Sequence, residues 1–391
     1  MRSLPRIQIV NSTLYATCID GGCASIGHEL RTLGLLLQAS RAGDVDFYFD
    51  AGETPCHHFD PLHHRRSTQR GERSSAHVPV VTHETRDGCD NVLAPPRALK
   101  SLSDGARWLV RTGEQELAHW AAARRNRVLW RGAATGQGPS FSSDGRPVST
   151  RARAVQLSAK RPELLDARFA GRDDDLRMTD RERMRVRQLK WGADGGASFL
   201  TWREMQQYRA VLILDGNTVA DRLPFTMFTM TAVLKQESPL REAWYSQLVP
   251  YVHYVPVRHD LSDLEAQLAW ALSNTSRLFD IARNGALLAL RHLSRRAQLC
   301  HWSGLLRGLA ALTTHPVEVD PKARQIDPTR EFTSTILGQG TVLHEPFATA
   351  PSTLRPQLTH RPPRLSDIRE MLHISLTRCL ETTRTHLCLD L

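Results

Sequence analysis

The sequence predicts an α/β protein made of two doubly wound, Rossmann-type domains that face each other across a cleft. Short apolar runs typical of buried strands alternate with segments of helical spacing, and the alternation occurs in both halves of the chain. Such an order predicts parallel sheets with helices on both faces. With 391 residues, 41% of them hydrophobic, the chain is long enough to form two domains of this kind.

The first half begins the alternation with an expected helix over 26–43, where Leu30, Leu33 and Leu37 recur at helical spacing before Gly43. The β-branched and aromatic runs that follow are typical of strands. The remaining elements expected in this half are strands at 45–50, 78–83 and 127–130 and a helix over 103–123.

The second half repeats the alternation. Its last expected helix begins at a capping box, in which Ser262 caps the backbone and Glu265 reaches back three residues later. The other expected elements are helices at 151–160, 202–209 and 241–248 and strands at 211–215, 232–235 and 251–257.

A polar, glycine-rich stretch at 132–149 marks the expected domain boundary. After residue 314 the periodicity fades, apart from a possible helix at 365–381. The predicted organisation is an N-terminal Rossmann-like domain (1–140), a C-terminal Rossmann-like domain (141–314) and an irregular extension (315–391).

The amino-acid composition limits the kinds of partner and ligand that the chain is expected to bind. The net charge of +10 permits anionic ligands, but no stretch interleaves aromatic and basic residues as a single-strand binding platform would. We therefore expect no nucleic-acid partner. Seven cysteines without a CxxC pair argue against a zinc ribbon or a thioredoxin-like site. No apolar signal-peptide core and no eighteen-residue apolar run is visible, so neither a leader nor a transmembrane segment is expected.

The stretch 214–236, LDGNTVADRLPFTMFTMTAVLKQ, has the layout of an anion site. A strand ends, the chain turns at Gly216, and Arg222 precedes a short apolar helix that starts near Pro224. Ligands of doubly wound sheets bind beyond the carboxyl ends of strands, and a helix N-terminus favours an anion. Arg222 is thus either a phosphate ligand or a solvated surface charge.

A longer set of motifs resembles glycosyltransferase family 90. These are DGNTVADRLPFTMFTMTAVLKQ, REAWYSQLVPYVHYVPVRHDLSDLEAQL, IARNG, LWRGAATG with the following TRARAVQLSAKRPELLDARF, and CHWSGLLRGLAAL. The family includes Rumi-type protein O-glucosyltransferases, capsule-associated xylosyltransferases and lipopolysaccharide-modifying proteins. The resemblance covers about residues 45–312 and is strongest over 200–285.

The resemblance implies a GT-B fold in which 1–140 is the acceptor-side domain and 141–314 the nucleotide-sugar-binding domain. It also implies an inverting transfer of glucose or xylose from a UDP-sugar to a hydroxyl of a protein or glycan acceptor. It implies no metal and no other cofactor. By analogy with eukaryotic members, it places the chain in the secretory lumen, in the endoplasmic reticulum or Golgi.

It also implies site residues. Two family arginines that grip the donor diphosphate fall on Arg151 and Arg222, although Arg151 taken alone would be assigned to a helix surface. The catalytic base of the family falls on Glu53, where members commonly have aspartate. Asp50 is the reserve, and its alternative is a strand-end turn residue. The remaining donor-side residues are Gly132, Gly216, Thr218, Val219, Ala220 and Asp221.

Some features depart from the family. Cys300 keeps the position of a cysteine that family members tie to an N-terminal segment, but the sequence offers it no clear partner. With glutamate at 53, this leaves an alternative: a catalytically inactive fold or truncated product that binds sugar or protein. The acidic stretches 44–46 and 173–175 resemble the carboxylate pairs that hold a metal in other glycosyltransferases, but the first is interpreted as turn chemistry and the second as a solvated run. The histidine-rich stretch 56–64 has the spacing of no standard zinc site, so no metal is expected.

Overall fold

The computed structural model forms two compact units, residues 1–46 with 306–391 and residues 47–305. We call them the smaller and the larger unit. The boundaries predicted from sequence at 140 and 314 remain a prediction. The structure describes residues 4–18, 23, 26–39, 42–52, 78–89, 91–96, 117–136, 139–170, 179–188, 200–313 and 316–327.

The smaller unit contains a β-hairpin that the sequence did not predict. Strands β1 (Arg6–Val10) and β2 (Thr13–Thr17) pair antiparallel. Asn11 and Ser12 connect them with φ angles of 51° and 59°. Positive φ at both central residues is what a two-residue hairpin turn requires, and asparagine tolerates it well. The usual glycine is absent, so the turn was missed.

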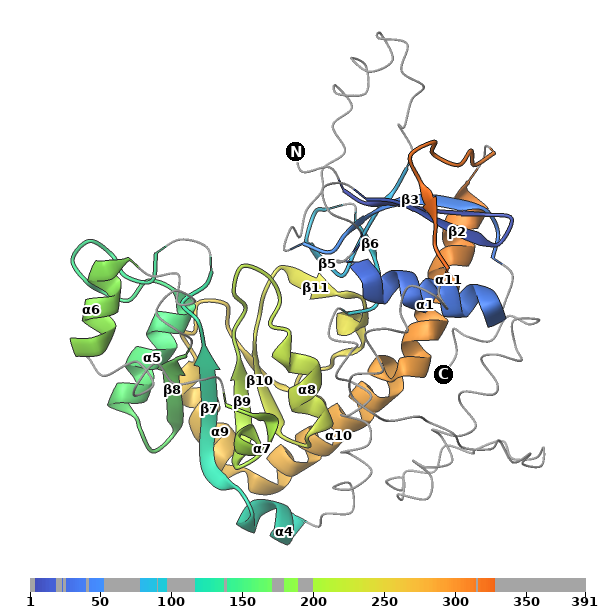
Figure 1. Cartoon of the computed structure of the whole chain (residues 1–391). Helices are drawn as coiled ribbons and strands as arrows, with labels where there is room; N and C mark the ends of the chain where they lie inside the picture. Colours follow the sequence, from blue (N-terminus) through green and yellow to red (C-terminus); the bar gives the residue numbers. More distant parts are fainter. Residues whose placement is uncertain are drawn as a thin grey trace, which may run out of the picture. The chain divides into compact units, whose positions relative to one another are not determined.

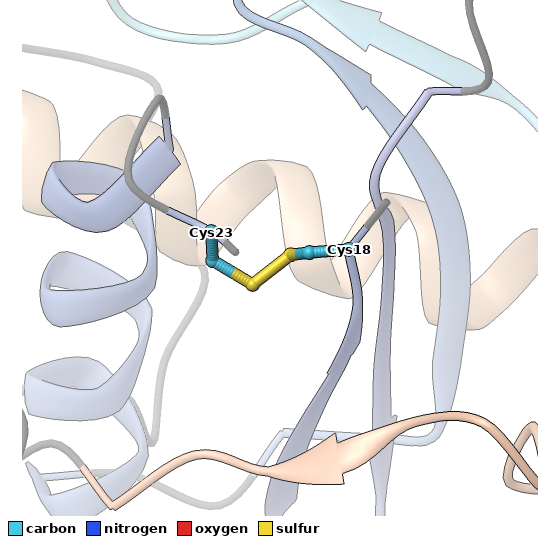
Figure 2. The surroundings of a disulfide bond; sticks show 2 residues. All are labelled: Cys18 and Cys23. Carbon is cyan, nitrogen blue, oxygen red and sulfur yellow. A yellow bond between two sulfur atoms is a disulfide. The ribbon is translucent and has the colours of Figure 1, made fainter. Parts of the chain in front are cut away.

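Two further segments complete the smaller unit. Helix α1 (Gly27–Ala39) confirms most of the helix expected over 26–43. Strand β13 (Arg324–Gln325) pairs with β2, so the predicted irregular extension contributes a strand to this unit. The Cys18–Cys23 disulfide lies between the end of β2 and the start of α1, as Figure 2 shows.

The first sheet segment of the larger unit is parallel. Strands β3 (Val45–Asp50), β4 (Val80–Thr82) and β6 (Val92–Leu93) pair in that order. A separate two-stranded ladder joins β5 (Glu84–Arg86) to β11 (Leu240–Glu242) in antiparallel register. The ladder brings together segments that are far apart in the sequence and places Glu84 opposite Glu242.

The core of the larger unit is a five-stranded parallel sheet in the order β12-β10-β9-β7-β8 (Figure 1). Every residue of β10 is buried, as expected for a parallel strand covered on both faces. The α/β class with parallel sheets is therefore confirmed. The strands are β7 (Arg125–Gly132), β8 (Leu165–Phe169), β9 (Tyr208–Ile213), β10 (Ala232–Gln236) and β12 (Val255–Val257).

Helices cover this sheet. Helix α8 (Arg222–Phe228) and helix α10 (Thr275–Leu293) pack on each other and on β10, α5 (Thr150–Lys160) packs on β8, and α9 (Leu264–Ser273) on β12. Of the described helices, none combines the length and apolar character that a membrane crossing needs. The others are α4 (Leu117–Ala122), α6 (Asp180–Gln188), α7 (Trp202–Met205) and α11 (Arg295–Leu312).

Several predicted elements differ from the observed ones. The strand at 127–130, assigned to the first half, is part of β7 and pairs with β8 and β9 in the second sheet. The helix expected over 241–248 is a strand followed by a short 3-10 helix, Ala243–Gln247, because β11 finds its partner in β5. The residues 103–116 and 365–381 lie outside the described residues.

Three helix or strand boundaries also need correction. The helix expected over 202–209 ends at Met205, since Tyr208 already belongs to β9. Only 255–257 of the strand expected at 251–257 is extended. The capping box is wrong: Asp263 occupies the N-cap of α9 without a side-chain cap hydrogen bond, because the Asp263 carboxylate instead accepts from the Arg258 backbone N–H.

Candidate functional site

The two predicted diphosphate arginines meet at the carboxyl end of β7. Arg222 Nη1 donates a hydrogen bond to the carbonyl oxygen of Arg131, and Arg151 Nη1 donates to that of Ala133 at 2.8 Å. The two acceptors are the residues on either side of Gly132 in the sequence. A Cβ at Gly132 would lie 2.9 Å from Trp130 Cζ2 and 3.3 Å from Arg222 Nη2. Glycine therefore leaves room for the Trp130 ring and the arginine at this strand end.

Arg151 lies in the first turn of α5 and is only 7% exposed. It donates from Nε to the Asp215 carbonyl at 3.1 Å, from Nη2 to the Leu214 carbonyl at 3.2 Å and from Nη1 to Thr135 Oγ1. With the bond to Ala133, these use four of its five N–H groups. Arg151 thus ties the ends of β7 and β9 together and keeps one donor for a ligand.

Arg222 is placed differently. It is the first residue of α8, and among the described residues its side chain makes one hydrogen bond, to the Arg131 carbonyl. Four of its five N–H groups therefore remain for a phosphate or solvent. Of the two arginines, Arg222 is the better equipped to bind an anion in a bidentate manner.

The charges of the two arginines influence each other. Burial and the positive charge of Arg222 together lower the pKa of Arg151 to about 10, and the Asp215 carboxylate opposes the shift. Burial also lowers the pKa of Arg222 to about 10, and Asp221 opposes that shift. Both groups are charged at neutral pH. Two partly desolvated cations near one strand end favour the binding of an anion between them.

Gly216 follows β9 at the point where the chain passes Arg151. A Cβ at this position would lie 2.7 Å from Arg151 Nη2 and 2.7 Å from Thr135 Oγ1. Because Arg151 is fixed by its hydrogen bonds, it cannot move aside cheaply. The Gly216 backbone N–H donates to the Thr218 carbonyl at 2.9 Å, which closes the first turn of the loop. This glycine is required by close approach rather than by a positive φ.

Two backbone amides of the loop 216–221 are bound by carboxylates. Val219 N donates to Glu84 Oε2 at 3.2 Å, and Ala220 N donates to Asp215 Oδ1 at 3.1 Å. Both carboxylates come from within the larger unit, and these hydrogen bonds fix the path of the loop.

Asp221 occupies the N-cap of α8 but makes no side-chain cap hydrogen bond. The helix begins at Arg222, two residues before the predicted start near Pro224, and it is a single short segment of seven residues. Positive charge at this end of the sheet therefore comes mainly from the side chains of Arg151 and Arg222 rather than from a long helix dipole.

Of the two residues predicted as the catalytic base, the structure describes Asp50. Asp50 ends β3, is 7% exposed, and its Oδ1 accepts a hydrogen bond from Gly52 N at 2.6 Å. This contact is the one expected of a strand-end turn residue. Glu53 lies outside the described residues. The assignment of a base therefore stays a prediction.

Sequence reasoning missed two buried carboxyl groups beside the loop. Glu84 and Glu242 are each 6% exposed and are register partners in the β5–β11 ladder. Trp244 Nε1 donates to Glu242 Oε2 at 2.9 Å. Nothing in the local sequence signals this pair, because it depends on two strands that meet only in the folded chain.

Of the three stretches in which no metal site is expected, the structure describes one, residues 44–46. Asp44 accepts a hydrogen bond from Asn11 N at 2.8 Å, and Asp46 forms an ion pair with Arg6. The stretches 56–64 and 173–175 lie outside the described residues. Within the described part of the chain, no group of three metal-ligating side chains is found. Metal independence remains a prediction.

Among the described residues, cysteines at three places in the chain form disulfides. Cys18 pairs with Cys23 in the smaller unit. Cys89 and Cys300 are each disulfide-bonded, and the sequence alone left the pairing of Cys300 open.

A first prediction concerns the start of α5. Ser149 caps the helix and accepts a hydrogen bond from Ala152 N at 3.2 Å. Ser149→Ala is expected to lower the free energy of unfolding by about 1 kcal/mol, because an amide of the first turn loses its acceptor. Urea unfolding of Ser149→Ala and the hydroxyl-keeping Ser149→Thr would measure this. Equal stability of the two variants would contradict the capping role.

Comparison with known proteins gives a consistent family signal. The family model of glycosyl transferase family 90 matches residues 32–373. Human Protein O-glucosyltransferase 3 is 32% identical over 169 residues, which cover 43% of this chain and 31% of that protein. Zebrafish (Danio rerio) Protein O-glucosyltransferase 2 is 34% identical over 106 residues, or 27% of this chain and 21% of that protein.

A viral protein matches more of the chain. The "Uncharacterized protein 027R" of Frog virus 3 is 28% identical over 265 residues, covering 63% of this chain and 27% of the viral protein. The chain thus aligns with about a third or less of the length of these relatives. The residues that the family model matches include Arg151, Arg222 and the loop 216–221.

Proposed function

The chain belongs to glycosyl transferase family 90, and from this premise we propose that it transfers a sugar from a UDP-sugar to a hydroxyl group. The observation that carries the proposal is the convergence of Arg151 and Arg222 at Gly132, at the carboxyl end of a parallel strand. UDP is the leaving group of such a transfer, and a pair of cations at that point is suited to stabilise the negative charge that develops on its diphosphate.

We propose that Arg222 and Arg151 have different roles at the donor site. Arg222, with four N–H groups left, binds the diphosphate directly, and Arg151 adds one donor while holding the ends of β7 and β9 in register. Each charge-assisted hydrogen bond to phosphate contributes about 1.5–3 kcal/mol. Thr218, Val219, Ala220 and Asp221 set the path of the loop that leads into Arg222.

The transfer we propose is inverting and needs no metal. A carboxylate, Glu53 or in reserve Asp50, takes the proton of the acceptor hydroxyl. The acceptor oxygen then forms the new bond to the anomeric carbon from the face opposite the departing UDP, whose C–O bond breaks. General-base assistance of this kind contributes about 10²–10⁴-fold to the rate. The donor sugar is glucose or xylose and the acceptor a protein or glycan.

The fold and compartment follow as further parts of the proposal. The family favours a GT-B arrangement of two Rossmann-type domains. The disulfides at Cys18, Cys23, Cys89 and Cys300 suit an oxidising compartment, so we propose the secretory lumen, in the endoplasmic reticulum or Golgi. A nucleic-acid partner is not part of the proposal.

The decisive experiment is thermal or chemical unfolding with and without UDP. UDP at a hundred times its Kd is expected to stabilise the wild type by about 2.7 kcal/mol. Arg222→Ala is expected to lose this stabilisation. Arg153→Ala, an exposed arginine on α5, serves as the matched control and is expected to keep it. Equal UDP stabilisation of all three proteins would overturn the donor site.

A second candidate is an inactive family member that binds sugar or protein, suggested by glutamate at position 53. UDP release from UDP-glucose and UDP-xylose separates the two candidates. The enzyme releases UDP when acceptor is present, and Glu53→Gln lowers that rate by about 10²-fold or more. UDP binding without release would favour the inactive binder.

A further inference from the structure

Two acidic residues far apart in the sequence lie face to face beside the donor loop. Glu84 of β5 and Glu242 of β11 are direct partners in the antiparallel ladder, and each is only 6% exposed. Like charges directly opposite each other destabilise a ladder, and two buried carboxylates in one place cannot both ionise cheaply. Their burial together is explained if the pair carries one proton at neutral pH.

The surroundings of Glu242 agree with a retained proton. Burial raises the pKa of Glu242 to about 8; the Trp244 N–H opposes the shift, and the charges of Asp221, Glu84 and Asp215 add to it. Lys235 of β10 is the nearby cation, and its ammonium lies 4.8 Å from the ring centre of Tyr245. The charged groups that act on Glu242 from outside the pair thus include two carboxylates, Asp215 and Asp221, and the ammonium of Lys235.

Glu84 connects this pair to the donor loop. Its Oε2 accepts the hydrogen bond from Val219 N, across a sequence separation of 135 residues. The next amide, Ala220 N, is held by Asp215 Oδ1 from the end of β9. The loop is therefore fixed from two sides directly before Arg222, whose own side chain is anchored only on the Arg131 carbonyl among the described residues.

We propose that Glu84 and Glu242 form a buried carboxyl pair that carries one proton and positions the loop 216–221, and through it Arg222, for the donor diphosphate. The inference deepens the proposed function and rests on it. Glu84 is a positioning residue and does not touch the donor. When the pair loses its proton, repulsion between the two carboxylates weakens the hold of Glu84 on Val219, and donor affinity falls.

The test is the affinity for UDP, measured by calorimetry from about pH 7 to about pH 9, across the pKa near 8. Wild-type Kd is expected to rise about tenfold through this range. Glu242→Gln keeps a neutral partner for Glu84, so its Kd should stay constant. Persistence of the wild-type pH dependence in Glu242→Gln would overturn the inference.

Variants at Glu84 test the link to the loop. Glu84→Ala removes the acceptor for Val219 N and is expected to raise both the Kd for UDP and the KM for the UDP-sugar about tenfold, the equivalent of one hydrogen bond, with kcat little changed. Glu84→Gln keeps an amide oxygen at this position and should restore most of the affinity. Glu237→Gln, an exposed glutamate after β10, is the control and should match the wild type.

The outcomes separate this inference from the proposed function. If the wild type binds UDP and Glu84→Ala binds it equally well, only the positioning role is wrong. If the wild type itself does not bind UDP, the donor site falls and the inference falls with it. Amide hydrogen exchange without nucleotide adds an independent readout: Val219 should exchange faster in Glu84→Ala than in Glu84→Gln, and equal exchange would count against the contact.

Discussion

Arg151→Ala is expected to destabilise the larger unit by about 3 kcal/mol or more and to abolish UDP binding. The side chain satisfies the carbonyl oxygens of Ala133, Leu214 and Asp215, and each buried acceptor left without a partner costs about 1–3 kcal/mol. The carboxyl ends of β7 and β9 would lose the link that holds them in place. The end of β7 around Gly132, to which the Arg222 side chain is hydrogen-bonded, would then no longer be held in place.

Urea unfolding and UDP titration of the same protein measure both parts of this expectation. Arg151→Lys is the informative companion, because a single ammonium cannot replace a planar group that donates in four directions. We expect it to be nearly as damaging as alanine. Arg153→Ala, exposed on the same helix, is the control. A loss below about 1 kcal/mol in Arg151→Ala would show that Arg151 is only a helix-surface charge.

Glu242→Gln is expected to change the pH dependence of stability by a few kcal/mol. Burial raises the pKa of Glu242 from 4.5 in the unfolded chain to about 8 in the folded protein. The folded state therefore holds this proton more tightly than the unfolded state does. The corresponding stability is fully present below pH 4.5 and is lost as the pH rises towards 8, at about 1.4 kcal/mol per pH unit.

Glutamine cannot lose that proton, so the variant should gain stability relative to wild type between about pH 5 and about pH 8. Urea unfolding at three pH values across this range would measure the difference. Glu237→Gln provides the exposed control, for which no such trend is expected. A constant difference between Glu242→Gln and wild type across the range would show that Glu242 ionises normally in the folded protein.

The parts of the fold that could be predicted are those encoded locally. The run VLILD and the glycine after it specify a strand end, and Arg222 follows at a distance that any strand–loop–helix unit would fix. The helix containing Arg151 could be predicted for the same reason. The convergence of the two arginines on Gly132 needed only the parallel order of neighbouring strands. Their chemical roles remain predictions.

The parts that could not be predicted depend on distant partners. Leu240 to Glu242 form a strand only because β5 pairs with them, so a helical pattern at 241–248 was misleading. The hydrogen bond from Val219 N to Glu84 could not be predicted either, because the two residues are 135 positions apart in the sequence. Both features depend on the pairing of distant segments.

The ladder between β5 and β11 has a consequence for the order of assembly. Its strands lie more than 150 residues apart along the chain, at Glu84–Arg86 and Leu240–Glu242. Contacts of such separation form slowly, because closing a long loop costs conformational entropy before any contact compensates for it. The five-stranded sheet can therefore form during synthesis before the β5–β11 ladder does, and so before the proposed nucleotide site is complete. A newly made chain should gain its secondary structure first and its affinity for UDP last.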